Sequence, residues 1–460
     1  MPALAADRTH AGRQASSLPV GGCCTSTPIG AKRCDRGSAP AYRHIVLPRP
    51  TTGSDFMTKG GKHMFLQIHF LTSHHASLLN RDDAGLAKRI TFGGVPRLRV
   101  SSQCQKKHWR DALIPTLPDL PFGIRSRLAF QEIAKEARRQ GVADERVHSL
   151  TRLLGESVMT LASGKRGRSV FDDAGQLLLA QPILLGRPEI RYLASIVADA
   201  AKESPDEAGT RQAIEQRIKR LEKKNLLALM RQAGMPKPAC GVEGALFGRF
   251  ITSDILARVD APVHVAHAFT VHALQTEMDY FTVVDDLLEE QEETGAAHVN
   301  ETELGTGIFY GYVAMDLPLL VSNFTGCDRN SWRDALVSEP AVCRVIESFI
   351  RVVAQTSPGA KLGATAPHTW AELILLEVGK SMPRSLANAY LQPIGMQEGQ
   401  DPMQLAVDAL AAQLNRYARI YGDTGEQRWA ATDREWNACK VARLSEATRA
   451  ALDTIFGDVS

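Results

Sequence analysis

The feature that most constrains this fold is a block of about a hundred residues with helical periodicity, set between segments that alternate like strands. Within residues 122–230, Leu128, Ile133, Leu150 and Leu154 recur at the spacing of one helix face. The flanking segments instead carry short runs of β-branched and aromatic residues, which favour strands. The sequence therefore predicts an α+β protein with a large, all-helical insertion.

The segments outside this block supply the remaining elements. We expect strands at residues 65–72, 95–100, 263–274, 308–315 and 371–378, and helices at 103–113 and 331–356. A hairpin-like element follows the insertion, and the chain beyond the last strand is mostly helical. Without insertions the order is strand, helix, strand, strand, helix, strand, which is the ferredoxin-like order of RNA-recognition domains.

Charge and composition exclude several classes of protein. Residues 1–63 carry nine Lys/Arg and three Asp, so the net charge of +3 leaves −3 for the rest of the chain. That body is not a globally basic nucleic-acid binder, and any such binding must come from local patches. No run reaches the roughly 18 apolar residues of a membrane span. The eight cysteines form no CxxC pair, which disfavours a zinc module or disulfide scaffold and suits the reducing cytoplasm.

The first 63 residues differ from the body. They lack an amphipathic period and are rich in Gly, Pro, Ser, Thr and Arg, a composition that cannot bury enough surface to fold alone. We expect this extension to be disordered or not translated, with Met57 and Met64 as possible starts. A basic RNA-binding arm is the alternative interpretation.

The densest basic feature lies at residues 81–110. Eight cations face only Asp82 and Asp83: Arg81, Lys88, Arg89, Arg97, Arg99, Lys106, Lys107 and Arg110. Ser101, Ser102 and Gln103 place hydroxyl, amide and backbone N–H donors at the start of the predicted helix. Helix N-termini bind phosphate readily, so this pattern favours a phosphate-gripping patch that ignores base identity. A solvated helix face is the alternative.

A second feature is the small-residue turn at 357–367, between the long helix and the last strand. Gly359 and Ala360 allow a backbone to approach a ligand closely, and Lys361 adds a point charge for phosphate. The turn lacks the glycine spacing of a P-loop and follows a helix rather than opening one. An ordinary connector is the other interpretation.

Histidines and aspartates that could suggest metal chemistry are His264, His267, His272, Asp279, Asp285 and Asp286. Along a strand, His264 and His272 face one way and His267 the other, so a structural role is favoured. Residues 285–303 hold eight acids and no Lys/Arg, which indicates a solvated loop. Tyr310 and Tyr312 share a face and faintly match the aromatic platform of RNA-recognition strands, although packed sheet aromatics are favoured. No nucleophile motif is present, so no catalytic residue, metal or cofactor is predicted.

Several short motifs, taken in order, resemble one family. They are Leu79-Asn80-Arg81-Asp82-Asp83, Phe92-Gly93-Gly94, Arg97-Leu98-Arg99-Val100-Ser101-Ser102-Gln103, Ala245-Leu246-Phe247-Gly248-Arg249-Phe250, Val265-Ala266-His267-Ala268-Phe269-Thr270-Val271-His272, Asp279-Tyr280-Phe281-Thr282-Val283-Val284-Asp285-Asp286-Leu287, Gly307-Ile308-Phe309-Tyr310-Gly311-Tyr312, Pro358-Gly359-Ala360-Lys361 and Ser385-Leu386-Ala387-Asn388-Ala389. Their joint order is similar to that of the CasC family, the backbone subunit of the type I-E CRISPR surveillance complex (Cascade), in the Cas-seven superfamily.

The resemblance implies a hand-shaped protein. Its palm would be a modified RNA-recognition fold at 64–113 and 267–460 with C-terminal helices, its fingers the helical insertion at 114–240, and its thumb a hairpin at 241–266. Residues 1–63 fall outside it. Copies of the family polymerise along a guide RNA (crRNA) for antiviral defence, and the bases of the guide pair with target DNA.

The resemblance also implies roles for residues. Ser101, Ser102, Gln103, Lys106, Lys107 and Arg110 would grip the guide backbone, Gly359, Ala360 and Lys361 would form a second palm loop, and Arg249, Phe250 and Ile251 would lie in the thumb. Partners would be crRNA, target DNA through the guide, other copies of the chain and other Cascade subunits, with no enzyme activity of its own. The alternatives are a metal-dependent ribonuclease of the same superfamily using Asp279, Asp285 and Asp286, and an oligomeric structural protein without nucleic acid.

Overall fold

The computed structural model of the chain describes residues 63–160, 170–171, 176–204, 206–223, 226–249, 258–283, 298–337, 339–395 and 399–457. The predictions made for the extension at 1–63 therefore fall outside the described residues, apart from His63. The same holds for Phe250, Ile251, Asp285 and Asp286. None of the described helices is both long and apolar enough to cross a bilayer.

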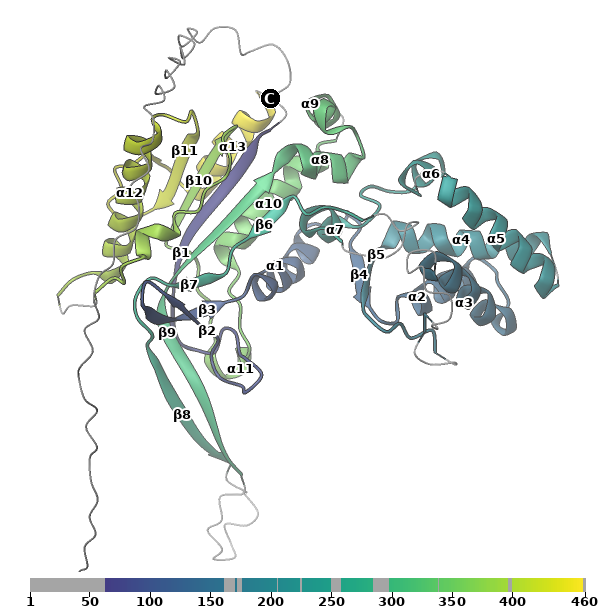
Figure 1. Cartoon of the computed structure of the whole chain (residues 1–460), viewed down its shortest axis with the longest axis horizontal. Coiled ribbons are helices and arrows are strands. Elements are labelled where there is room, and N and C mark those ends of the chain that lie inside the picture. Colours follow the sequence, from purple (N-terminus) through teal and green to yellow (C-terminus); the bar gives the residue numbers. More distant parts are fainter. Residues whose placement is uncertain are drawn as a thin grey trace, which may run out of the picture. The chain divides into compact units, whose positions relative to one another are not determined.

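One large sheet organises the described chain (Figure 1). Its main path is β12-β11-β10-β1-β9-β7-β3-β2, and β6 and β8 also pair with β9. The strands are β1 Phe65–Ser77, β2 Arg89–Phe92, β3 Val95–Val100, β6 Val263–Val265, β7 Ala268–Thr270, β8 Thr276–Val283, β9 His298–Asp316, β10 Leu373–Gly379, β11 Gln427–Thr432 and β12 Lys440–Val441. All of these pairings are antiparallel except that of β11 with β12, so the sheet is mixed.

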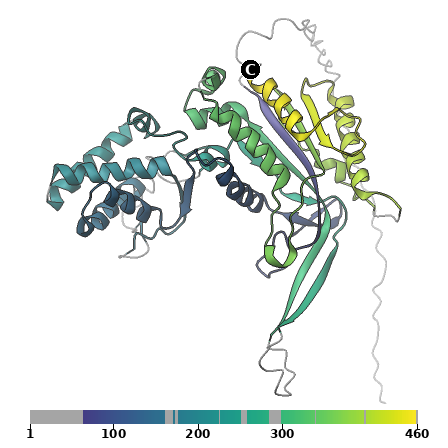
Figure 2. The same ribbon diagram turned by 180° about the vertical axis from the view of Figure 1, so that it is seen from behind.

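The two faces of the sheet are covered by different helices, because successive strand residues point to opposite sides. Leu66, Ile68 and Phe70 of β1 pack with α1 Ser102–Thr116, α8 Leu317–Thr325, α9 Trp332–Val337, α10 Ala341–Gln355 and α13 Leu444–Phe456. Leu71 belongs to the opposite face, which is covered by the short helix η3 Ala387–Tyr390 and by α12 Pro402–Tyr421. Figure 2 shows α10 and α13 in front of the sheet, with α12 at its edge.

The inserted block has a core of its own. Its helices are α2 Ala129–Arg139, α3 Asp144–Thr160, α4 Arg187–Glu203, α5 Glu207–Lys223 and α6 Leu226–Gln232. Phe130, Ile133 and Leu193 are fully buried in this second cluster. The block is not all-helical as predicted, because β4 Gly123–Ser126 and β5 Ile183–Gly186 pair as a two-stranded ribbon. These strands are only four residues each, too short for a period-2 signal.

Three predicted elements differ from those observed. The single helix expected at 331–356 is wrong: the short helix η2 Arg329–Ser331 and α9 precede a break at Pro340, which lacks the N–H that a continuous helix needs. The strand expected at 263–274 is two short strands, β6 and β7. Residues 298–303, expected as part of a solvated loop, belong to β9.

The segment expected as a hairpin at 241–266 begins with a helix, α7 Val242–Phe247. Beyond it, Arg249 and Val259 form an isolated antiparallel bridge, and residues 250–257 lie outside the described part of the chain. The hairpin that projects from the sheet in Figure 1 is β8–β9 instead, paired from Thr276 with Gly305 to Val283 with His298.

Candidate nucleic-acid interface

The N-terminus of α1 is capped as the sequence predicts. The Ser101 hydroxyl accepts a hydrogen bond from the Cys104 backbone N–H at 3.3 Å, and its own backbone N–H donates to Asn80 Oδ1 at 2.9 Å. The hydroxyl and backbone N–H of Ser101 are therefore used in hydrogen bonds within the fold, and Ser101 is buried. Ser102 is half-buried and Gln103 is exposed, so the first turn of α1 presents these two side chains to the surface.

The cations of α1 lie on different sides of the helix. Gln105 and Trp109 form its buried face. Lys106 is half-buried with its Nζ 5.7 Å from the centre of the Phe247 ring, and burial together with the nearby Arg125 charge lowers its pKa. Lys107 lies on the exposed ridge.

Asp111 partly neutralises this helix. Its carboxylate accepts from Lys107 Nζ at 2.6 Å and from Arg110 Nη2 at 3.0 Å. Partial burial acts to raise the pKa of Asp111, but the hydrogen bonds from Lys107 and Arg110 hold the pKa below its usual range. Two of the predicted phosphate-binding cations are thus already paired with a carboxylate, which a polyanion would have to outcompete.

The small-residue turn packs beside α1. The Gly359 backbone N–H donates to His108 Nε2 at 3.4 Å, and the Ala360 backbone N–H donates to Leu78 O at 2.8 Å. The structure thus brings the turn, predicted from a distant part of the sequence, against the helix predicted to bind phosphate.

Lys361 contacts the projecting β8–β9 hairpin. Its Nζ donates to Thr302 Oγ1 at 2.5 Å and lies 5.2 Å from the centre of the Phe281 ring. Lys106 packs on Phe247, on a different side of α1 from His108, since residues two apart on a helix point about 200° apart. The structure brings Gly359 and Ala360 to α1 but does not bring Lys106 and Lys361 to the same neighbours.

The hairpin is held from its other face as well. Glu303 of β9 is buried, accepts from the Ala87 backbone N–H at 2.8 Å and forms an ion pair with Arg89. On β8 beside these positions, Met278 and Tyr280 are exposed, with Tyr280 at 60%. The sequence patterns considered above did not identify this surface. The alternation of Thr276, Met278 and Tyr280 with acidic residues was the signal that could have indicated it.

One cation of the 81–110 feature is structural. Arg97 is fully buried and donates to Thr270 O at 2.9 Å and to Tyr390 O at 2.7 Å, so it joins β3 to β7 and η3. Its inclusion in a phosphate patch was wrong, because a guanidinium with these backbone acceptors and no exposure cannot reach a ligand. Burial lowers the pKa of Arg97.

Arg249, assigned to the thumb, is buried in an ion pair. Its Nη1 lies 2.5 Å from Glu189 Oε2 of α4 and donates to Leu184 O at 3.2 Å. The two groups lie side by side in the interior, where a charge is stable only with its partner. Arg249 therefore joins the segment after α7 to the helical block.

The histidines considered for a metal site do not converge. His264 is exposed and contacts Ala261 O, whereas His272 is buried and accepts from the Ile308 backbone N–H at 3.2 Å through Nε2. His267 lies against Arg99 instead. Within the described ranges, no group of three His, Cys, Asp or Glu side chains could hold a metal ion. Asp279 lies on β8.

Tyr310 and Tyr312 are packed inside the protein, as favoured. The Tyr312 hydroxyl donates to Gln67 Oε1 at 2.7 Å, and the Tyr310 hydroxyl accepts from the Leu386 backbone N–H at 2.9 Å. Burial raises the pKa of both phenols. Because η3 and α12 cover this sheet face, it cannot serve as an open base-stacking platform.

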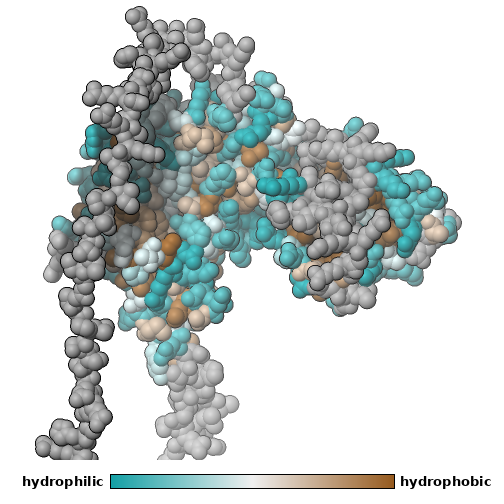
Figure 3. Space-filling view, in the orientation of Figure 1, coloured by the Kyte–Doolittle hydropathy of each residue, from teal (hydrophilic) through white to brown (hydrophobic). Residues whose placement is uncertain are grey.

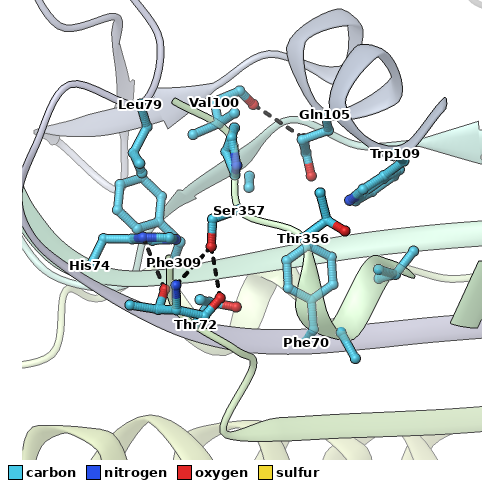
Figure 4. Close-up of a pocket in the computed structure, with 15 residues that line it drawn as sticks. Phe70, Thr72, His74, Leu79, Val100, Gln105, Trp109, Phe309, Thr356 and Ser357 are labelled. Atoms are coloured by element: carbon cyan, nitrogen blue, oxygen red, sulfur yellow. Dashed lines mark hydrogen bonds between the residues drawn. The ribbon is translucent and has the colours of Figure 1, made fainter. Parts of the chain in front are cut away.

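The space between α1, the sheet and the small-residue turn is a small cavity of about 30 Å³. Figure 4 shows Gln105 and Trp109 above it, with Phe70, Thr72 and His74 below. Gln105 Oε1 is buried and has no hydrogen-bond partner among the residues that the structure describes, while His74 Nδ1 lies 3.0 Å from Thr369 Oγ1. Burial lowers the pKa of His74 to about 4. Such a volume holds one or two waters at most and excludes a nucleotide.

A nucleotide must therefore bind outside this cavity. Figure 3 shows that the visible face carries scattered hydrophobic residues among hydrophilic ones rather than one continuous apolar area.

A family model described as CT1975-like protein matches residues 66–456. The chain belongs to the CT1975-like protein family. A solved chain titled "CRISPR RNA-guided surveillance complex, pre-nicking" is 27% identical, with a TM-score of 0.66, over 84% of this chain and 100% of its own length. Another, titled "CRISPR RNA-guided surveillance complex", is 23% identical over 85% and 99%, with a TM-score of 0.58, and shows the fold alone. No curated protein matches.

Proposed function

We propose that this chain is a non-enzymatic scaffold that binds CRISPR guide RNA (crRNA) and polymerises along it as the backbone of a type I-E Cascade complex. The observation that carries the proposal is the packing of the Gly359–Ala360 turn against α1, beside the first two turns of that helix, which expose Gln103 and Lys107. The similarity to a chain of an RNA-guided surveillance complex over that chain's whole length supports it.

The strand order supports a ferredoxin-like palm. The central strands β10-β1-β9-β7 are antiparallel, and α1 and α10 pack on one face of them. This is the arrangement expected when two strand–helix–strand units interleave in one sheet. We propose that β2, β3, β8 and the C-terminal elements are additions to that palm, and that the helical block forms the fingers.

Two partner assignments belong to the same proposal. Other copies of the chain would line up along the guide, and target DNA would be recognised through base pairing to the guide rather than by this protein. The chain's net charge is only +3, which fits contacts to the guide's backbone made by local patches. Such backbone contacts position a nucleic acid and carry no sequence information.

The binding test compares two double variants in RNA titrations. Lys106→Ala with Lys107→Ala should weaken binding to single-stranded RNA of any sequence and reduce the slope of log K against log salt by about 0.7 for each phosphate that the variant no longer neutralises. The matched control is Lys135→Ala with Lys202→Ala, which removes two lysines from α2 and α4. Equal slopes in both variants would contradict the assignment of α1 to RNA.

A second measurement separates the scaffold from the ribonuclease alternative. Incubation of the purified protein with RNA and Mg²⁺ or Mn²⁺ should leave the RNA intact. Metal-dependent cleavage that Asp279→Asn abolishes would favour the ribonuclease. A preparation that neither carries RNA, judged by its 260/280 nm absorbance ratio, nor binds added RNA would favour a structural protein without nucleic acid.

A further inference from the structure

Three basic residues come together near the edge strand β2, next to the start of α1. Arg99 of β3 pairs with Phe269 of β7, which places Arg99 beside His267 in the short link between β6 and β7. The Arg99 Nη1 atom lies 2.7 Å from His267 Nδ1. Lys88 adjoins them, since its backbone O accepts from the Arg99 backbone N–H at 2.8 Å. We name Lys88, Arg99 and His267 the basic edge.

The contact between Arg99 and His267 fixes the protonation of the imidazole. A guanidinium only donates hydrogen bonds, so Nδ1 must accept, and the imidazole must be neutral there with its proton on Nε2. Partial burial, Arg99 and Lys88 together lower the pKa of His267, in that order. Arg99 from β3 and Lys88 from the segment before β2 are the charged groups that act on His267, and both are cations.

No carboxylate balances the basic edge among the residues that the structure describes. The nearest cation on the same strand pair, Arg89, is paired with Glu303, and the cations of α1 share Asp111. Lys88 and Lys107 also act together on Cys104 in the first turn of α1. An excess of positive charge thus surrounds the N-terminus of a helix, where the helix dipole adds to it.

We propose that the basic edge binds one phosphate group of the RNA and that His267 takes up a proton from solvent when it does so. This inference rests on the proposed function and adds His267, with its proton uptake, to the cations Lys88 and Arg99 that the sequence already places in a phosphate-binding patch. A phosphate oxygen would replace His267 Nδ1 as the acceptor for Arg99, and the protonated imidazole would then donate to the same phosphate. Two cations and a neutral imidazole in the free protein become three cations around one anion.

The proton uptake sets the direction of the pH effect. A nearby anion favours the charged form of an imidazole and raises its pKa. RNA should therefore bind more tightly as the pH falls, by up to about 10-fold per pH unit where one proton is taken up on binding. A basic edge that merely attracts RNA would give affinity without this dependence.

The test uses the full chain and single-stranded RNA of mixed sequence, titrated between about pH 5.5 and 8, where imidazole changes charge. The unmodified protein and a His264→Gln control should both show the tightening at low pH, because His264 is exposed and its Nε2 contacts Ala261 O rather than the basic edge. His267→Gln should show an affinity independent of pH in this range. Unchanged pH dependence in His267→Gln would overturn the proposal.

A second readout keeps this inference separate from the proposed function. The pKa of His267, followed by imidazole NMR with inorganic phosphate as the probe, should rise on phosphate binding and should not rise in Arg99→Gln. If the protein bound no RNA, the proposed function would fail, but the phosphate titration would still decide whether the site exists. If RNA bound and the pKa of His267 did not move, only the basic edge would be wrong.

Discussion

Two charged regions of this protein are built in opposite ways. Under η3 and α12, the fully buried Glu377 accepts from His69 Nε2 at 3.0 Å, from Arg384 Nη1 at 2.8 Å and from Arg428 Nε at 2.5 Å. At the basic edge, basic groups contact one another, and within the described chain no carboxylate acts on His267.

The difference follows from solvent. A buried charge without a partner is very costly, so the interior has to balance Glu377 within the chain. Burial alone would raise the pKa of Glu377, but the hydrogen bonds from His69 and Arg384 hold that pKa well below its usual range. The basic edge lies at the surface, where water and salt tolerate an excess of charge until an external anion arrives. The first region stabilises the fold, and the second is available to a ligand.

The largest effect on stability is expected for the buried charge cluster around Glu377. Glu377→Gln should lower the free energy of unfolding by about 3–5 kcal/mol, because it leaves buried partners of the carboxylate uncompensated. Urea unfolding measures this loss. Glu132→Gln, which breaks the exposed pair with Lys135, should change stability by less than about 1 kcal/mol. A loss of stability in Glu377→Gln no larger than in Glu132→Gln would contradict the claim that the buried charge cluster stabilises the fold.

A smaller effect concerns acid sensitivity of the interior. The pKa of His74 is about 4 because of burial, with the neighbouring His75 as a minor cause, whereas the unfolded chain binds that proton near pH 6.5. Stability therefore falls as the pH drops from about 6.5 to 4, by about 3 kcal/mol for this one group. His74→Asn should remove that part of the loss, and His267→Gln should not. Thermal unfolding at pH 7 and pH 4.5 compares the variants, and parallel losses in all three proteins would contradict the origin assigned to His74.

The smallest effect on stability is expected for Asp111 of α1. Asp111 is 44% exposed and partly neutralises Lys107 and Arg110, so Asp111→Asn should change stability by less than about 1 kcal/mol. It should nevertheless strengthen RNA binding several-fold and steepen the salt slope by about 0.7 per released cation. Asp408→Asn on α12, whose carboxylate accepts from Gln404 Nε2, is the control. Weaker RNA binding in Asp111→Asn would place the ligand elsewhere.

Local features of the fold could be predicted because they depend on neighbouring residues. Ser101 caps α1 with its own hydroxyl, and the Gly93–Gly94 turn joins β2 to β3 with positive φ angles of 64° and 80°. A side chain at Gly93 would collide with the backbone of Leu391, so the glycine also allows the turn to approach Leu391 closely. These signals lie within a few residues and can be read from the sequence without knowledge of the fold.

The candidate site could be predicted only in part. The helix and the turn that form it were identified, but the partners and burial of each cation were not. Arg97 donates to Tyr390, which is 293 residues away, and Lys361 donates to Thr302, which is 59 residues away. Neither partner is visible in a local pattern, and the same holds for the contact between Arg99 and His267, 168 residues apart.

The amino-acid sequence by itself determined the order of the central strands and helices, the cap of α1, a mostly helical insertion and the set of cations near residues 81–110. The tertiary structure alone decided which of those cations are buried, which are paired with a carboxylate and which are left for a ligand. The physical reason is that a cation carries the same charge wherever it lies, while its exposure and its partners depend on strands that meet only after folding.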